Sequence, residues 1–214
     1  IELDSSNGSK SPFYLTYQSG TTGFKNLNFG DSTLYNSVKD GGWHHYAFTF
    51  KNISGSVLVR GYIDGTPKFS TLTGSAVGEL NTPIVGVIGA LATGKNTLST
   101  INRDFHQSTA GLGYGKLSGS LDEFRFWKKE RSSKEVGRFF NTQVGAGSNE
   151  DVANTPLGVY YKFNEGTTGV NEIDNVILDY SGRLTNGQWV GYAGVGRNNG
   201  SAITESSSSF KEFK

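Results

Sequence analysis

The residues best suited to bind a ligand gather in a polar stretch, residues 93–116, which shows neither a helical nor a strand period. Structureless loops longer than about 15 residues are uncommon in compact domains and are often functional. Sugar recognition needs an exposed aromatic ring with hydrogen-bonding side chains beside it, and this stretch holds those types. We predict a ligand-binding site made of Asn102, Arg103, Asp104, His106 and Tyr114. The segment 188–192 holds the same residue types. The alternative for each aromatic ring is that it packs at an end of the sandwich, and we favour this alternative for Trp189.

Loop carboxylates and one histidine pair are the candidates for metal or acid–base chemistry. Calcium takes about six to eight oxygen ligands, and Asp31 and Asp104 lie in predicted loops rich in Asn and Ser. We name both as candidate calcium ligands, although solvated carboxylates are the favoured interpretation. His44 and His45 are neighbours in a predicted strand, so they point to opposite faces and do not share an ion. We expect one to be buried and hydrogen-bonded and the other exposed.

The elements that position these residues are strands. Apolar residues alternate with a period of two over 43–50, 57–63 and 119–128, and a strand buried on both faces is predicted over 83–91. Asp64-Gly65 between two strand-like runs predicts a tight hairpin. Ser132 followed by Glu135 forms a capping box, which predicts a short helix ending near residues 141–145. A further strand is predicted over 158–163.

Four motifs in this order resemble the laminin G-like jelly roll of the concanavalin A-like lectin and glucanase superfamily. They are Gly-Trp-His-His-Tyr-Ala at 42–47, Tyr-Ile-Asp-Gly at 62–65, Ile-Gly at 88–89, and Gly-Ser-Leu-Asp-Glu-Phe-Arg-Phe-Trp at 119–127 with the capped helix behind it. The resemblance implies an all-β fold, a two-sheet antiparallel jelly-roll sandwich with one short helix. It also implies an extracellular binding or adhesion role, and many members hold calcium at the rim.

The same resemblance argues against catalysis. Members that hydrolyse glucans carry Glu-x-Asp-x-Glu on one strand, because retaining cleavage needs two carboxylates about 5 to 5.5 Å apart. Here Ser120 and Phe124 occupy the two Glu positions, and Asp122 and Glu123 point to opposite faces. The chain has no cysteine. We predict that it is not an enzyme, and a glycoside hydrolase is the least favoured function.

The domain organisation leaves one alternative open. Residues 1–145 form the predicted jelly-roll body, 146–156 a connector and 193–214 a linker-like tail. The segment 157–192 contains sequences similar to the opening strands of the family, at 159–166 and 178–187, whereas strands expected before Ile1 are missing. These strands either complete the sandwich in permuted order or open a second, similar module. The absence of an initial Met suggests a piece of a longer protein.

Composition excludes several partners. Glycine is 30 of 214 residues, about twice the usual share, and the net charge is only +1, which argues against nucleic-acid binding. No apolar run is long enough to cross a bilayer, so we expect no membrane insertion. We predict a non-catalytic module of a larger protein at an extracellular or virion surface. Its partner would be a glycan or a surface protein. The alternative is a purely structural building block of a viral tail, fibre or capsid, whose partners would be neighbouring modules or subunits.

Overall fold

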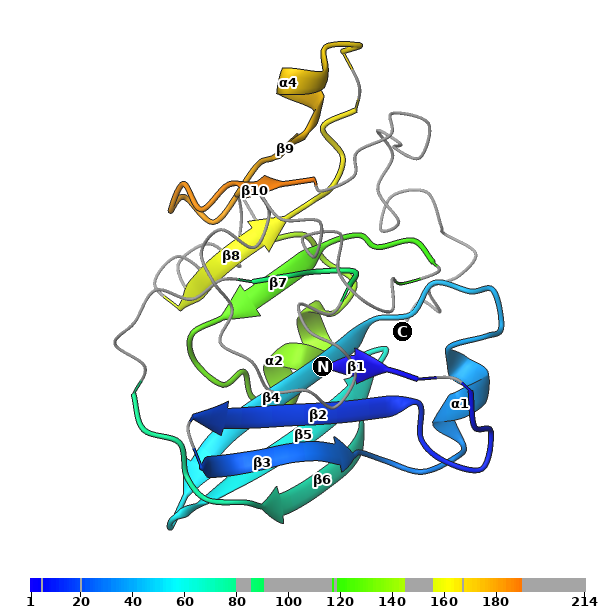
Figure 1. Ribbon diagram of the computed structural model, residues 1–214, viewed down its shortest axis with the longest axis vertical. Coiled ribbons are helices and arrows are strands. Elements are labelled where there is room, and N and C mark those ends of the chain that lie inside the picture. The colour runs from blue at the N-terminus through cyan, green and yellow to red at the C-terminus, as the bar shows by residue number, and fades with distance from the viewer. Residues whose placement is uncertain are drawn as a thin grey trace. The chain divides into compact units, whose positions relative to one another are not determined.

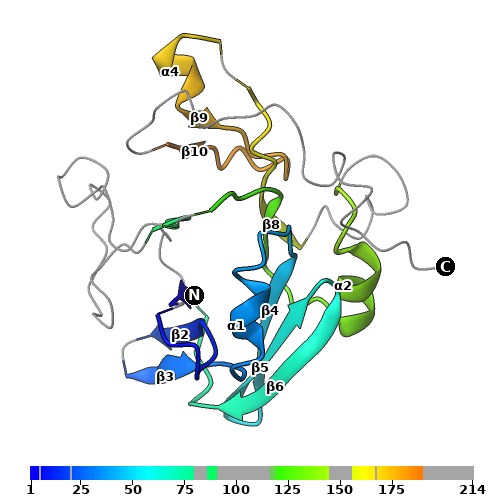
Figure 2. The ribbon, with the colours of Figure 1, turned by 90° about the vertical axis from the view of Figure 1, so that its right-hand side faces the viewer.

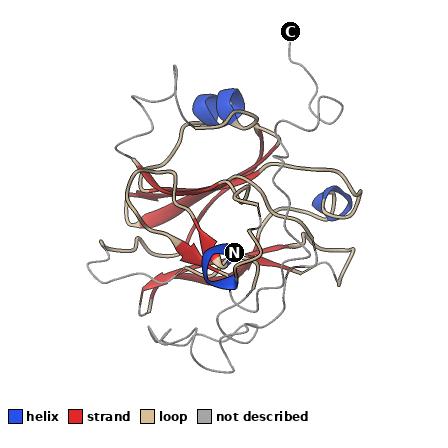
Figure 3. Cartoon of the chain, turned by 90° about the horizontal axis from the view of Figure 1, so that it is seen from above, coloured by secondary structure: helices blue, strands red, loops and turns tan. Residues whose placement is uncertain are grey.

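The computed structural model describes residues 1–4, 6–19, 21–79, 86–90, 117, 119–144, 156–166 and 168–189. The chain divides into two compact units, each described by itself below. Unit 1 comprises residues 1–83 and 130–142, and unit 2 comprises residues 84–129 and 143–214. Strands predominate among the described elements, and the helices are short (Figure 3). Every strand pairing is antiparallel, so the predicted all-β class is confirmed.

Unit 1 is a sandwich of two three-stranded sheets, ordered β1-β2-β3 and β4-β5-β6 (Figure 1). The first sheet contains β1 (Glu2–Leu3), β2 (Phe13–Ser19) and β3 (Thr22–Asn28). The second contains β4 (Tyr46–Ile53), β5 (Ser56–Ile63) and β6 (Thr66–Thr73). β2 and β3 lie on one side of the second sheet, and the helix α2 lies on the other (Figure 2).

Two matching hairpins connect the strands of the second sheet. Ser54-Gly55 joins β4 to β5, and the predicted Asp64-Gly65 turn joins β5 to β6. All four turn residues have positive φ, between 47° and 83°, which is the geometry of type I′ turns. This geometry suits the twist of the strands and needs glycine or a small polar residue, so the local sequence is enough to place both turns.

The main core of unit 1 lies between its sheets. Leu15, Val57 and Val59 are fully buried, and Phe29 packs against them. Aromatic rings close the layer: Tyr17 stacks on Phe50 with centroids 5.1 Å apart. Burying each aliphatic side chain contributes about 1.5–3 kcal/mol. A slip of one residue would turn these side chains away from the core, so their burial fixes the register of the strands.

The helix α2 (Ser133–Phe139) covers the opposite face of the second sheet. Its predicted capping box is confirmed, because the Ser132 hydroxyl accepts from Glu135 N and the Glu135 carboxylate accepts from Ser132 N. The Tyr62 and Ser133 hydroxyls are 2.9 Å apart. A second helix in unit 1, α1 (Leu34–Ser37), has only one turn, too short for a helical period to show in the sequence.

The described part of unit 2 contains two short sheets. One pairs β7 (Phe124–Trp127) with β8 (Leu157–Tyr161), and the other pairs β9 (Val176–Ile177) with β10 (Gly187–Gln188). The one-turn helix α4 (Asn171–Asp174) precedes β9. Leu157 and Tyr160 are buried together with Val144, and Trp127 packs on them. The strand predicted over 83–91 is wrong for its described part: residues 86–90 form no strand and Ile88 is exposed.

Candidate functional site

The predicted ligand-binding residues Asn102, Arg103, Asp104, His106 and Tyr114 all lie outside the described residues. Asp31 is described, and its carboxylate accepts hydrogen bonds from the backbone and hydroxyl of Thr33, which lower its pKa. Within the described ranges no cluster of three or more His, Asp or Glu could hold a metal ion. Calcium also takes carbonyl, amide and water oxygens, so Asp31 and Asp104 both stay predictions as calcium ligands.

The Tyr180 turn, residues 178–186 of unit 2, is held together by one carboxylate. Asp179 Oδ1 accepts from the backbone N of Tyr160 and Ser181, and Oδ2 accepts from the Ser181 hydroxyl and Thr185 N, all within 2.9–3.0 Å. Burial alone would raise the pKa of Asp179, but these hydrogen bonds outweigh it and lower the pKa. The carboxylate therefore stays ionised near neutral pH and fixes the turn.

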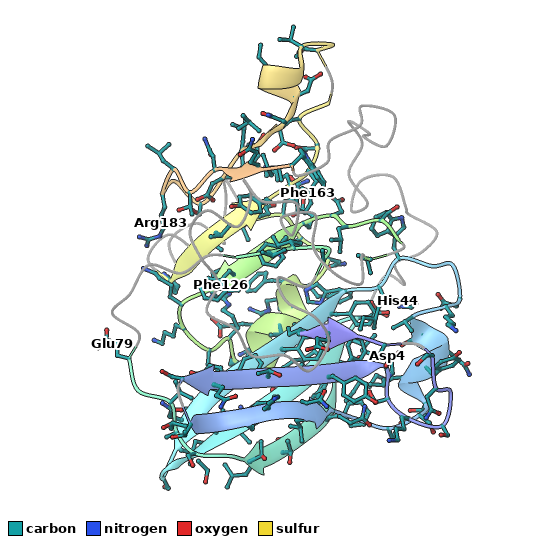
Figure 4. The ribbon with its side chains drawn as sticks, viewed as in Figure 1. Asp4, His44, Glu79, Phe126, Phe163 and Arg183 are labelled. Atoms are coloured by element: carbon teal, nitrogen blue, oxygen red, sulfur yellow. The ribbon has the colours of Figure 1, made fainter. Side chains whose placement is uncertain are left out.

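Neighbouring groups of unit 2 fasten the turn at further points. Asn186 Oδ1 accepts from Asp179 N at 2.9 Å, and the Tyr161 hydroxyl donates to Thr185 O at 2.7 Å. Arg183 Nε donates to Leu157 O of β8, also at 2.7 Å (Figure 4). Side chains on both sides of the turn therefore hold its backbone in place.

This turn displays apolar side chains to solvent. Leu178, Tyr180 and Leu184 are 43%, 42% and 85% exposed, respectively. The Lys162 ammonium lies 4.7 Å from the centroid of the Tyr180 ring, and the Tyr160 ring packs against Tyr180 edge to face at 6.3 Å. Burial, with a smaller contribution from Glu165, raises the pKa of Tyr180. Its hydroxyl therefore remains protonated and can donate a hydrogen bond.

Trp189, the other aromatic candidate in unit 2, is half-buried. Its ring packs against Phe163 with centroids 5.8 Å apart, and its backbone N donates to Asn175 O at 2.8 Å. Phe163 in turn packs against Tyr161, whose ring lies 6.0 Å away. Trp189 thus contributes to the packing of unit 2, and Tyr180 is the more exposed ring of the two.

A buried carboxylate and a tyrosine form the arrangement most like a catalytic pair. The Tyr160 hydroxyl donates to Glu123 Oε2 at 2.5 Å, and Arg125 Nη2 donates to the same oxygen at 2.9 Å. A tyrosine nucleophile assisted by a carboxylate occurs in some glycosidases, but it must meet substrate and lose its proton easily. Tyr160 is fully buried, and burial together with Glu123 raises its pKa. The cluster therefore stabilises the interior of unit 2.

The histidine pair of unit 1 is likewise arranged against acid–base catalysis. His44 Nδ1 is 2.8 Å from Asp64 Oδ2, and His44 Nε2 is 2.8 Å from Asp40 Oδ2. While both contacts are made, each ring nitrogen of His44 faces a carboxylate oxygen and neither is open to a substrate. His45 packs against Phe140 of α2, with ring centroids 5.9 Å apart. Both histidines are half-buried, so the prediction of one buried and one exposed histidine is wrong.

The core of unit 1 leaves no room for a small ligand. A cavity of about 10 Å³ lies among Phe13, Phe29, Leu34, Tyr46 and Phe69, which is space for about one water molecule.

Sequence reasoning missed the Tyr180 turn as a candidate site. It treated residues 178–187 as similar to the family's opening strands, with a turn at Ser181-Gly182, and did not single out Leu184 as exposed. A useful signal was present in Asp179 followed by Ser181 and Asn186-Gly187, since Asp and Asn side chains organise turns by bonding nearby backbone groups. It also missed that Asp40 and Asp64 would meet at His44.

Unit 1 is an antiparallel β-sandwich with a closed core. The chain belongs to the laminin G-like family of the concanavalin A-like lectin/glucanases superfamily, whose family model matches residues 1–137. No curated protein and no solved structure matches the chain. Laminin G-like domains are typically non-catalytic modules that bind carbohydrate or protein, and they are often extracellular. No helix in the described ranges is long and apolar enough to cross a bilayer.

Proposed function

We propose that this chain is a non-catalytic binding module of a larger protein at an extracellular or virion surface. Its ligand is a glycan or a surface protein, and the Tyr180 turn is the contact surface. The observation that carries the proposal is the exposure of Leu178, Tyr180 and Leu184 on a turn that Asp179 fixes through four hydrogen bonds.

Rigidity and exposure together support recognition. A loop that is already ordered does not lose conformational entropy when a ligand binds, so more of the contact energy appears as affinity. The Tyr180 ring offers an apolar surface together with a hydroxyl donor, and the Lys162 ammonium beside it can bond a sugar oxygen or a carboxylate. Leu184 projects an apolar group that would fit a pocket on a protein partner.

A structural building block is the second candidate function. Exposed apolar side chains on a rigid turn also suit contacts between subunits or modules of one assembly, and the 85% exposure of Leu184 is the observation that favours this alternative. The two functions differ in what covers the turn: an external ligand in the first, and another copy or module of the same assembly in the second.

A glycan array and a display library of surface proteins, each read with calcium and with a chelator, test the proposal on the full chain. We expect binding that falls at least tenfold in Tyr180→Ala or Leu184→Ala. Leu72→Ala on β6, where the leucine is 59% exposed, is the matched control. Loss of binding in the chelator would bring Asp104 into the site.

Two outcomes would reject this assignment. Equal weakening by Leu72→Ala and Leu184→Ala would show that the Tyr180 turn is not the contact surface. No binding to glycans or proteins, combined with self-association in light scattering that Leu184→Ala abolishes, would replace the binding module by the building block.

A further inference from the structure

The contacts of His44 in unit 1 depend on whether its ring is protonated. They are not part of the proposed binding surface, the Tyr180 turn. We propose that Asp40, His44 and Asp64 form a proton-operated clamp, which fastens loop 39–44 to the 64–65 hairpin when His44 is protonated and releases Asp40 when it is not. The clamp lies in unit 1, so its test is independent of the Tyr180 turn in unit 2.

Hydrogen-bond chemistry requires this behaviour. An imidazolium ring has two N–H donors, whereas a neutral ring has one donor and one lone pair. Both nitrogens of His44 lie 2.8 Å from a carboxylate oxygen, so both contacts are hydrogen bonds only while the ring is protonated. After loss of one proton, a nitrogen lone pair faces a carboxylate oxygen at one of the two contacts, and that contact opens.

The surrounding bonds decide which contact opens. Asp64 is held a second time, because its Oδ1 accepts from His45 N at 2.9 Å, and its own backbone N donates to His45 O at 2.9 Å. The other hydrogen bonds to Asp40, from Gly42 N and from its own backbone, lie within its own loop, and its side chain is 48% exposed. The neutral ring therefore keeps Nδ1–H toward Asp64 and loses the proton of Nε2, which frees Asp40.

The neighbouring titratable side chains are Tyr46 and His45, and the His45 ring packs against Phe140 of α2. Tyr46 on β4 has its ring 6.2 Å from His44, and burial raises its pKa to about 12, so it stays neutral. For His44, desolvation lowers the pKa, but the hydrogen bonds to Asp64 and Asp40 outweigh it, so the pKa is raised. Hydrogen bonds from Gly42 and His44 lower the pKa of Asp40, which therefore remains a carboxylate.

The sign of the effect follows from the raised pKa. The stabilisation by the clamp is complete below the ordinary histidine pKa of about 6.5 and is lost as the pH rises through the folded-state pKa of His44. The net charge of the three side chains then changes from one negative charge to two. The loop that is released carries Trp43, whose side chain is 40% exposed, so proton loss changes the surface at this end of unit 1.

Nitrogen-15 and proton NMR of the full chain, titrated from pH 5 to 9, provides the test, with the His44 signals assigned by their loss in His44→Gln. We expect a His44 midpoint above the ordinary value and, above that midpoint, a neutral ring protonated at Nδ1. Asp40→Asn should lower the midpoint. The matched control is Asp31→Asn, since Asp31 is another exposed loop carboxylate of unit 1 that bonds a residue two positions ahead, and it should leave the midpoint unchanged.

Three results would overturn the clamp. They are a midpoint at or below the ordinary value, an equal downward shift in Asp31→Asn, and a neutral ring protonated at Nε2. The last result would show that the Asp64 contact opens instead. The midpoint and the tautomer of His44 are both read in the unmutated chain, and the variants supply the assignment and the control.

Discussion

Gly65 in the hairpin between β5 and β6 offers the sharpest test of the packing in unit 1. A Cβ at this position would lie 2.5 Å from Phe140 Cδ1 and 3.1 Å from Gly137 Cα of α2. Gly55, in the equivalent turn between β4 and β5, has the same sign of φ, but its Cβ would meet nothing within 4 Å. The pair separates the cost of backbone strain from the cost of the contact with α2.

The expected magnitudes follow from these two terms. An L-residue in the left-handed region costs about 1–2 kcal/mol, and this term applies to both Gly55→Ala and Gly65→Ala. Forcing a methyl group into a packed contact adds about 1–3 kcal/mol, and this term applies only to Gly65→Ala. We expect losses of about 1–2 kcal/mol for Gly55→Ala and about 2–5 kcal/mol for Gly65→Ala. Effects on the unfolded chain are the same for both changes and cancel in the difference.

Urea unfolding followed by near-ultraviolet circular dichroism, which reports the packing of aromatic rings, measures both losses. Gly65→Ala should cost less stability in a Phe140→Leu background than in the unmutated chain, because the smaller side chain makes room for the methyl group. Equal losses for Gly55→Ala and Gly65→Ala would refute the reasoning, since they would show that contact with Phe140 does not require glycine at this turn.

Two further predictions concern unit 2. Tyr160→Phe removes the donor to Glu123 and leaves a buried carboxylate with fewer partners; we expect a loss of about 1–3 kcal/mol in thermal or urea unfolding, and unchanged stability would contradict a structural role for the cluster. Deletion of 157–192 removes β8, the partner of β7, together with Leu157 and Tyr160 of the core. We expect the β7 amides to lose protection from hydrogen exchange. Removal of the linker-like tail 193–214 is the control and should leave them protected. Protection of β7 that persists without 157–192 would favour a separate second module.

Local signals in the sequence determined much of the fold. Asp64-Gly65 and the Ser132 and Glu135 capping box each specify a conformation through bonds between residues only a few positions apart. The alternation over 57–63 specifies a strand through the burial of one face. All three are present in the structure, and the strand predicted over 158–163 is found at 157–161. The resemblance to the laminin G-like jelly roll depended on such motifs in order, and the family match over residues 1–137 confirms it.

Tertiary structure alone decided the features that distant residues share. Asp40 and Asp64 meet on one imidazole because the 64–65 hairpin lies beside loop 39–44, although Asp64 is 20 residues from His44. Asp179 reaches the backbone of Tyr160, 19 residues away, and thereby presents Tyr180 and Leu184 to solvent. Periodicity tells which face of a strand a side chain occupies. It does not tell which other strand or turn will lie opposite, because that depends on register and packing between segments far apart in the chain.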